Sequence, residues 1–352
     1  MSKRGKKRKK LRFGCFTKLI LLACLSGVLL FIAVDYVFNL RGNLTFVAFR
    51  NSDQPLYVKL ESGDWKKVGD ITIAELFAAQ DDQSRTPGAT WRTLTIKRPA
   101  QGLLQGITQM GLGAEIHVLE FDPAMFSFST SFQKDFVLTT ARERLSADDA
   151  VFAITANFRD PDGKPLGLVV HRGQQVNRPF PAWTGYFFVK DGKPWFGPKS
   201  LFEETPGVLT EASQGYPSLL KNHTVFSYVD LAPNKYFDGD RLSYRALAGM
   251  RQDGRIVFVL SGNGGLMNIA EVATLAQKLN VQHATLLDGG KALQYSLRFS
   301  VLPHHFHAFN TWLNIDREPL QPERSPVFIT VKRKAESSPV KAAEPGGLQQ
   351  KL

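Results

Sequence analysis

Apolar and polar positions follow their most regular pattern between residues 255 and 290, where they predict two strands joined by a helix. Residues 255–260 form a short apolar run rich in β-branched side chains, which is typical of a buried strand. Residues 281–287 repeat this pattern. Between the two runs, apolar side chains recur at helical spacing and predict one buried helical face, formed by Ile269, Val272, Ala276 and Leu279.

A glycine-containing loop follows each of these strands. Residues 261–265 read Ser-Gly-Asn-Gly-Gly, and glycines let backbone N–H groups approach a ligand closely. Asn268 predicts the start of the helix, because Glu271 stands where it completes a capping box. Asp288-Gly289-Gly290 comes directly after the second strand. If the two strands are parallel neighbours, both loops lie at the carboxyl ends of strands, where open α/β sheets bind ligands.

The rest of the chain is rich in strand-like runs and predicts few helices. Asp191-Gly192 stands between two apolar runs and predicts a tight hairpin turn. We therefore expect an α+β or mixed α/β fold, with a strand-rich mixed sheet and at least one βαβ unit, preceded by one transmembrane helix. The expected segments are a basic cytoplasmic arm (1–12), a transmembrane signal-anchor helix (13–34), a linker and N-terminal extension (35–109), the main domain (110–334) and a disordered tail (335–352).

The N-terminal segment predicts attachment to a membrane. Residues 13–34 are apolar apart from Lys18, and this length suffices to cross a bilayer. The arm before them is basic, and the positive-inside bias predicts a single-pass protein of the inner (cytoplasmic) membrane, with its C-terminal domain in the periplasm or outside the cell. A cleaved signal peptide and a lipoprotein signal acylated at Cys24 are alternatives. The apolar run is long for the first, and it stays apolar after Cys24, which argues against the second.

Charge and cysteine content exclude several classes of function. The net charge is +12, but the eight basic residues of the arm leave only +4 for the remainder, which argues against a nucleic-acid partner. The two cysteines, Cys15 and Cys24, lie in or beside the apolar segment. We therefore expect no disulfide in the main domain. The lack of a dinucleotide fingerprint, together with the lack of cysteine, argues against redox chemistry, and no cofactor is expected. The histidines of residues 304–307 are candidate metal ligands, but no acidic residue or cysteine lies within a few residues, so we expect an ordinary loop there.

Four segments, in the same order, resemble motifs of the phosphodiester glycosidase family. Residues 152–168, which begin Phe-Ala-Ile-Thr-Ala-Asn-Phe-Arg-Asp, are similar to its early motif. Residues 214–219 (Gln-Gly-Tyr-Pro-Ser-Leu) resemble its central Gln-Ser-Gly-Pro segment. Residues 245–249 match its Arg-x-x-x-Gly element, and residues 287–290 its Leu-Asp-Gly-Gly signature. The resemblance covers about residues 114–297, and it implies the family's fold and the cleavage of a sugar-1-phosphodiester at its glycosidic bond.

The resemblance also implies roles for individual residues. Such cleavage needs a cation on the phosphate and a carboxyl group near the anomeric carbon. Arg245 suits the first role, because its guanidinium binds phosphate oxygens in pairs, and Asp288 suits the second as acid, base or nucleophile. Without the family, the sequence alone favours a structural salt bridge for Arg245 and a turn-capping role for Asp288. The expected substrate-binding residues are Thr155, Asn157, Gln214, Gly264, Gly289 and Gly290, and no metal is expected.

Three positions depart from the family pattern. Many relatives have Asn where this chain has Thr155 and Phe where it has Arg159, and Lys291 follows the Asp-Gly-Gly signature where relatives usually have Gly or Ser. Asn157 would share a strand face with Thr155, so it is a candidate to supply the missing amide. We expect a membrane-anchored hydrolase that acts on an envelope or extracellular glycan. The alternative is a catalytically inactive glycan- or anion-binding module, or a scaffold for polysaccharide assembly or export; the glycan and the oligomeric state stay open.

Overall fold

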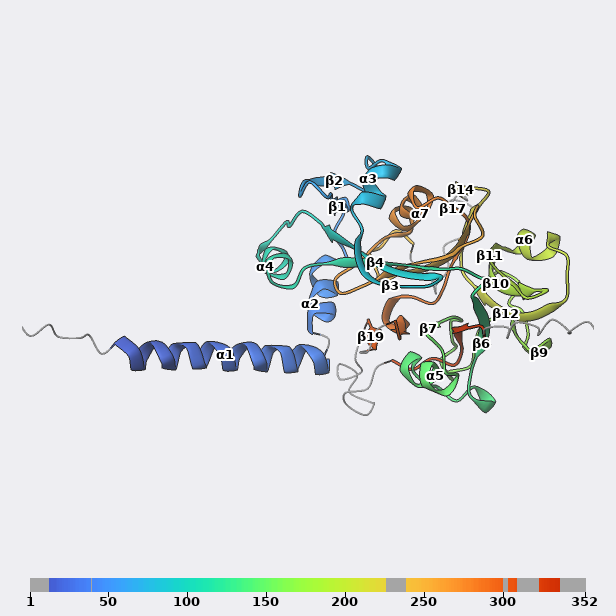
Figure 1. The fold of residues 1–352 in the computed structure, drawn as a ribbon, viewed down its shortest axis with the longest axis horizontal. Helices are drawn as coiled ribbons and strands as arrows, with labels where there is room; N and C mark the ends of the chain where they lie inside the picture. Colours follow the sequence, from blue (N-terminus) through green and yellow to red (C-terminus); the bar gives the residue numbers. More distant parts are fainter. Residues whose placement is uncertain (1–12, 39, 226–238, 300–302, 309–322, 336–352) are drawn as a thin grey trace, which may run out of the picture.

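The computed structural model describes residues 13–38, 40–225, 239–299, 303–308 and 323–335, and it has an α+β fold in which sheets dominate (Figure 1). This confirms the predicted fold class. The basic arm and the tail predicted beyond residue 335 lie outside the described residues. The helices are α1 (Phe13–Phe38), α2 (Leu40–Phe49), α3 (Ile73–Ala78), α4 (Leu103–Leu112), α5 (Ala141–Ala147), α6 (Lys199–Glu204) and α7 (Ile269–Lys278), with short 3-10 turns at Lys134–Phe136 and Gly290–Ala292.

The largest sheet has ten strands and contains both strands of the region 255–290, where the sequence pattern is most regular. Its order is β14 (Thr224–Val225), β13 (Ser218–Lys221), β17 (Val281–Leu286), β15 (Ala246–Arg251), β16 (Ile256–Ser261), β5 (Glu115–Phe121), β4 (Ala89–Lys97), β1 (Tyr57–Lys59) and β2 (Trp65–Lys67), and β3 (Asp81–Thr86) also pairs with β4. The strands of the predicted N-terminal extension therefore continue the same sheet as the main domain.

Two smaller sheets of five strands complete the fold. One has the order β11 (Lys193–Pro198), β10 (Gly185–Lys190), β12 (Leu209–Gly215), β8 (Val169–His171) and β9 (Gln174–Asn177). The other has the order β19 (His304–His307), β18 (Gln294–Leu297), β7 (Phe152–Thr155), β20 (Phe328–Arg333) and β6 (Phe126–Ser131). The turn between β10 and β11 is the predicted Asp191-Gly192 hairpin, in which both residues have positive φ angles, as this kind of turn requires.

The strand–helix–strand unit forms, but its strands are not neighbours. β15 lies between β16 and β17 and is antiparallel to both, so β16 and β17 run in the same direction one strand apart. α7 connects them, and its capping box is present: the Asn268 side chain accepts from the Glu271 N–H, and the Glu271 carboxylate accepts from the Asn268 N–H. The loops that follow β16 and β17 therefore lie at the same edge of the sheet, with the start of β15 between them.

Alternation along the central strands divides the core into two layers. On one face, Phe258 and Leu260 pack toward the sheet that contains β7 and β18. On the other face, Val257 and Val259 pack with the buried side of α7, including Ile269 and the other residues predicted for that face. Successive strand residues point to opposite faces, so one strand supplies both layers. The sheet is buried on both sides at its centre, which keeps the edge that carries the loops well positioned.

The N-terminal segment is helical throughout its described length. Thr17–Val34 within α1 has a mean hydropathy of 2.4, and α1 is the helix among the described residues that is long and apolar enough to cross a membrane; a signal sequence has the same character. The segment predicted as a membrane-proximal linker forms α2, which packs against α4. In Figure 1, α2 and α4 lie at the end of the folded domain that adjoins α1.

Candidate active site

The loop that carries Asp288 is fixed by main-chain hydrogen bonds to two neighbouring segments. The N–H of Leu287 donates to the Ala246 carbonyl at 2.9 Å, and the N–H of Gly290 donates to the Tyr244 carbonyl at 2.7 Å. The N–H of Asp288 donates in a third direction, to Ala156 O at 3.1 Å. The loop is therefore fastened both to the start of β15 and to the segment that follows β7.

The two glycines after Asp288 permit this close contact. A Cβ atom at Gly289 would lie 2.7 Å from the carbonyl oxygen of Tyr244, which is backbone and cannot rotate away. Gly290 has a φ angle of +60°, in the left-handed region that glycine adopts without steric cost. The geometry of the loop thus explains the Asp-Gly-Gly sequence. Main-chain contacts on both sides of Asp288 fix the position of its carboxyl group.

The Asp288 carboxyl group is in an environment that favours its neutral form. Its side chain is buried, and burial raises its pKa to about 8, because a low-dielectric surrounding disfavours the carboxylate. The positive charge of Arg159 opposes this rise in pKa, and the negative charge of Glu323 adds to it. Arg159 and Glu323 form an ion pair with each other. At neutral pH the carboxyl group is therefore largely protonated and able to donate a proton.

Arg245 directly precedes β15 and stands beside Asp288, which follows the neighbouring strand β17. β15 and β17 are antiparallel with Leu247 paired to Leu286, and extending that register by two residues sets Arg245 opposite Asp288. The Arg245 N–H donates to Ser261 Oγ at 2.8 Å, which attaches it to the end of β16. Its guanidinium Nη2 donates to the Arg241 carbonyl at 3.0 Å, and its Nε donates to Met267 O at 3.3 Å. The main chain around it therefore orients the guanidinium group.

A cavity of about 340 Å³ opens beside these two residues. Three arginine side chains from two segments reach it, and no acidic side chain lines it in the described part of the chain. Two aromatic rings, Phe46 and Phe158, stand among the lining residues, and aromatic rings pack well against the apolar faces of sugars. The lining residues are Phe46, Arg50, Phe158, Arg241, Leu242, Ser243, Arg245, Leu286, Leu287, Gly289 and Gly290. We call this space the candidate site cavity.

The structure brings Arg245, Gly289 and Gly290 to this cavity and sets Asp288 between two of its lining residues. Thr155, Asn157 and Gln214 do not line it. Thr155 Oγ1 donates to the carbonyls of Ala292 and Gln294, close to the loop after Asp288. Thr155 therefore stabilises the segment that follows Asp288 and does not line the cavity.

Asn157 and Gln214 hold neighbouring segments together through their side-chain amides. The Asn157 Nδ2 group donates to the carbonyls of Leu166, Leu168 and Gln214, and its Oδ1 accepts from Ser213 at 2.6 Å. Gln214 Oε1 accepts from two backbone N–H groups, and its Nε2 donates to Trp183 O at 2.8 Å. Both side chains are fully buried, so the chain itself takes up their hydrogen-bonding capacity.

Gly264 lies away from the candidate site cavity, at a second, smaller cavity. The N–H groups of the loop are used within the fold: Gly262 donates to Glu115 O at 3.0 Å and Gly265 donates to Gly262 O at 3.1 Å. A Cβ at Gly264 would meet the Gly113 carbonyl at 2.8 Å. These contacts make the loop a close-packed strand-to-helix connection.

The histidines of β19 lie in a partly buried, largely aromatic environment. The His304 ring lies 4.9 Å from Trp91 and 5.5 Å from His117, measured between ring centroids, and burial lowers the pKa of His304 to about 4. His305 Nδ1 lies 2.9 Å from Ser296 Oγ. Within the described ranges, no three His, Cys, Asp or Glu side chains are grouped as metal ligands would be.

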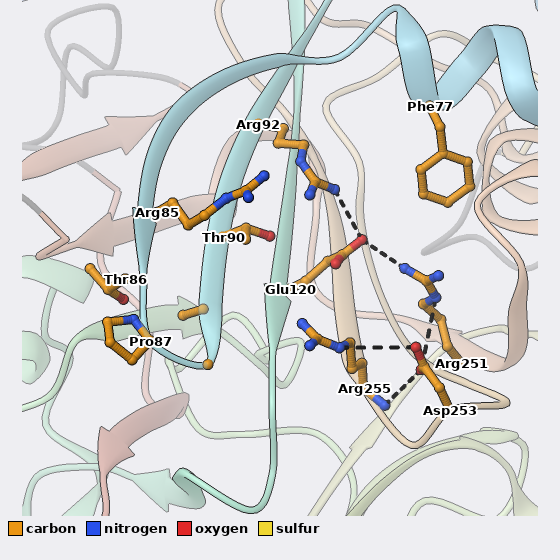
Figure 2. Close-up of a pocket in the computed structure, with 12 residues that line it drawn as sticks. Phe77, Arg85, Thr86, Pro87, Thr90, Arg92, Glu120, Arg251, Asp253 and Arg255 are labelled. Atoms are coloured by element: carbon orange, nitrogen blue, oxygen red, sulfur yellow. Dashed lines mark hydrogen bonds and ion pairs between the residues drawn. The ribbon is translucent and has the colours of Figure 1, made fainter.

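A larger cavity, of about 730 Å³, lies near the turn between β15 and β16 and contains four arginines (Figure 2). Its arginines face carboxylates: Glu120 accepts from Arg92 at 3.5 Å and from Arg251 at 2.9 Å. Asp253 lies 3.9 Å from both Arg251 and Arg255. We call this space the arginine cavity. Arg245 and Arg251 stand near opposite ends of β15, so the two cavities lie about 20 Å apart along the strand.

Sequence reasoning missed several residues of the candidate site. Phe46 lies in α2 and Arg50 directly follows that helix, in the segment predicted as linker and extension; their i, i+4 spacing was the available signal. Arg241 and Ser243 precede β15 and carry no motif. Glu323 influences Asp288 only because the tertiary fold brings the two together, and no local sequence pattern predicts this influence.

Comparison with protein families agrees with the resemblance read from the sequence. Residues 148–316 match the model of the phosphodiester glycosidase family. The matched range contains Asp288, Arg245 and the other residues named from the motifs. The match confirms the resemblance and supports a glycosidase-like hydrolase domain. A search of curated protein sequences finds no match to this chain.

Solved structures of similar fold come from an animal and a cyanobacterium. The catalytic domain of zebrafish N-acetylglucosamine-1-phosphodiester alpha-N-acetylglucosaminidase, auto-inhibited by its pro-peptide, is 13% identical with a TM-score of 0.51; the match covers 76% of this chain and 92% of that domain. A hypothetical protein from Synechocystis is 14% identical with a TM-score of 0.52, and the match covers 72% of this chain and 64% of that one, which is under two thirds of its length. At these identities the likeness concerns the fold.

Proposed function

We propose that the protein is a membrane-anchored hydrolase that cleaves a sugar-1-phosphodiester at its glycosidic bond, in an envelope or extracellular glycan. The observation that carries this proposal is the pairing of a buried, protonated Asp288 with an arginine-lined cavity that has no acidic lining residue among those described. The family match over residues 148–316 supports the same class of reaction.

The chemistry assigns separate tasks to the two kinds of residue. Arg245, with Arg241 and Arg50 from the other walls, binds the phosphodiester anion through charge-assisted hydrogen bonds. Phe46 and Phe158 pack against the sugar. Asp288 donates its proton to the oxygen that bridges the anomeric carbon and the phosphorus, so that this oxygen leaves with the phosphate. Water adds to the anomeric carbon, and the products are a free reducing sugar and a phosphomonoester.

The proposal is tested with the full-length protein in detergent and a panel of sugar-1-phosphodiesters in ¹⁸O-labelled water. Glycosidic cleavage places the label in the sugar and leaves the phosphate unlabelled. Release of sugar-1-phosphate, or label in the phosphate, would show cleavage of a P–O bond instead and would contradict the proposal. The anomeric configuration of the fresh product gives the stereochemical outcome in the same experiment.

A second candidate function is a glycan- or anion-binding module without catalysis. It is favoured by the surroundings of residues 155–157: Thr155 replaces the asparagine of many relatives, and the amide of Asn157 is fully engaged by the chain itself. Neither residue therefore offers an amide to a substrate. This candidate predicts saturable binding of a sugar-1-phosphodiester, measured by calorimetry, with no labelled sugar formed over the same period.

A further inference from the structure

Exposed apolar side chains gather on two helices next to the candidate site. Outside α1, nine large apolar side chains of the described residues are exposed, and five of them lie on α2 and α4; the others lie on separate elements. Leu103 is 83% exposed, which is a high value for a leucine in a folded domain. We call this set the apolar face; it consists of Leu44, Val47, Leu103, Leu104 and Ile107.

The two helices form one unit at the end of the domain nearest α1. Gln105 Nε2 of α4 donates to the Ala48 carbonyl of α2 at 2.9 Å, and Figure 1 shows the two helices beside each other. α1 ends at Phe38 and α2 begins at Leu40, so α2 starts at the bilayer surface when α1 spans the bilayer. The unit that carries the apolar face therefore lies close to the bilayer surface when α1 spans the bilayer.

α2 presents a different surface on each of its sides. Leu44 and Val47 belong to the apolar face. Phe46 and Arg50, four residues apart, line the candidate site cavity. Since both surfaces belong to one helix, the cavity and the apolar face are separated by about 10 Å, the width of a helix.

A third side of α2 contributes to the small apolar cavity at which Gly264 lies. Thr45 and Phe49 line this space of about 220 Å³, together with Trp65 and Lys97. The Lys97 ammonium group lies 4.1 Å from the centre of the Trp65 ring. Tryptophan and lysine side chains are both characteristic of the membrane–water interface, since each combines an apolar body with a polar end.

We infer that the apolar face enters the lipid headgroup region and that the substrate is itself a membrane lipid, in which a sugar is joined at its anomeric carbon, through a phosphodiester, to a lipid alcohol. This inference rests on the proposed function. The bond between the anomeric carbon and oxygen breaks, water supplies the hydroxyl of the free sugar, and the lipid keeps the phosphate as a monoester. The sugar reaches the candidate site cavity while the lipid chain stays at the bilayer beside α2.

The membrane contact is tested by fluorescence on the full-length protein in phosphatidylcholine vesicles. A background with Cys15→Ser and Cys24→Ser carries either Leu104→Cys or, as a control, Val208→Cys; Val208 is also exposed but lies before β12. Each cysteine carries a polarity-sensitive dye. We expect spin-labelled lipids to quench the dye at residue 104 and to leave the dye at residue 208 unquenched. Equal quenching at the two positions would overturn the membrane contact.

The substrate class is tested by comparing two substrates that share one sugar-1-phosphate. In one it is esterified to a long-chain alcohol in vesicles, and in the other to methanol in solution. Leu103→Ser, Leu104→Ser and Ile107→Ser together remove three residues of the apolar face, none of which lines the candidate site cavity. We expect this variant to lose about tenfold in turnover of the lipid substrate, because the site faces the bilayer less often, and to keep turnover of the methyl ester.

A matched variant with Val137→Ser, Val176→Ser and Val208→Ser removes exposed apolar side chains elsewhere and is expected to leave both rates unchanged. An unchanged ratio of the two rates in the first variant would overturn the lipid substrate while the proposed function stands. Absence of turnover of both substrates by the parent protein would overturn the proposed function and the substrate class with it. The quenching measurement would then still decide whether the apolar face meets the membrane.

Discussion

The candidate site cavity and the arginine cavity both contain several arginines, yet their electrostatics differ. In the arginine cavity, the four arginines share the lining with Glu120 and Asp253 (Figure 2), and Glu120 is held between Arg92 and Arg251. In the candidate site cavity, three arginines line the space with no carboxylate among the described lining residues. Asp288, which stands between two of its lining residues, has a pKa of about 8 and carries little charge at neutral pH.

This difference shows that the number of arginines does not by itself mark an anion site. A guanidinium group that already forms an ion pair with a buried carboxylate attracts an external anion less strongly. In the candidate site cavity, arginines stand beside a protonated acid, so positive charge and a proton donor lie close together. We therefore assign the larger cavity a structural role and, under the proposed function, place the phosphodiester in the smaller cavity.

The largest expected effect separates the aspartates of the two regions. Asp288→Asn removes the proton donor while keeping the shape of the side chain, so we expect kcat to fall by about 10³-fold. Asp253→Asn in the arginine cavity changes a half-exposed residue and should alter kcat by less than about twofold. Sugar release from one substrate measures both, and circular dichroism checks that each variant is folded. Similar losses of kcat in the two variants would contradict the distinction between the two cavities.

A smaller loss is expected from the arginines. Arg245→Met removes a guanidinium group from the candidate site cavity, and we expect kcat/KM to fall by about 10²-fold, since a charge-assisted contact to the phosphate is lost. Arg255→Met is the matched change in the arginine cavity and should leave kcat/KM within about twofold. Arg245→Lys keeps the charge without the paired N–H groups and should fall between the two. If Arg255→Met were the more damaging variant, the assignment of the two cavities would have to be exchanged.

Loss of stability should be larger for a change in the arginine cavity than for a change at Asp288, which is the reverse of the order expected for kcat. Glu120→Gln leaves Arg92 and Arg251 without their shared carboxylate, and we expect the free energy of unfolding to fall by about 2 kcal/mol with kcat unchanged. Asp288→Asn replaces a group that is already largely neutral and should not destabilise the protein at pH 7. Urea denaturation of the two variants beside the parent protein gives both values. A loss of stability on Asp288→Asn as large as on Glu120→Gln would indicate a charged Asp288.

The smallest expected effect is a shift in the pH profile. A proton donor must be protonated, and burial raises the pKa of Asp288 to about 8, so kcat should be constant through neutral pH and fall as the pH rises through about 8. The positive charge of Arg159 lowers this pKa, so Arg159→Met should move the fall to higher pH. Combining it with Glu323→Gln removes the charge that raises the pKa and should reverse part of the shift. A profile that rises through pH 8 would assign Asp288 the role of base or nucleophile.

Local sequence signals predicted the elements that depend on local physics. The capping box of Asn268 and Glu271, the buried face of α7 and the Asp191-Gly192 turn are all present, because each needs only residues a few positions apart. The resemblance also named Arg245 and Asp288 as candidates, and the register of β15 and β17 sets them opposite each other. Periodicity could not show that β15 lies between β16 and β17, since strand order is a property of the whole sheet.

The surroundings of the site depended on contacts that a linear pattern does not contain. Arg159 and Glu323 influence Asp288 although Glu323 is far away in the sequence and outside the four motifs. Thr155 and Asn157 were expected to contact substrate from their place in a motif, whereas their hydrogen bonds hold the chain itself together. The residues of α2 were predicted as part of the linker and N-terminal extension (35–109), because a ten-residue helix beside a transmembrane segment has too short a pattern to stand out.

The contact between Gly289 and the Tyr244 carbonyl has a consequence for how such a site diversifies. Main-chain atoms hold Asp288 in place, while side chains from α2 and from the segment before β15 form the walls of the candidate site cavity. Under the proposed function, mutations in the walls can therefore exchange one sugar or one leaving group for another without disturbing the acid. Reactivity and selectivity are inherited separately in this architecture, which lets selection explore new substrates without first giving up turnover.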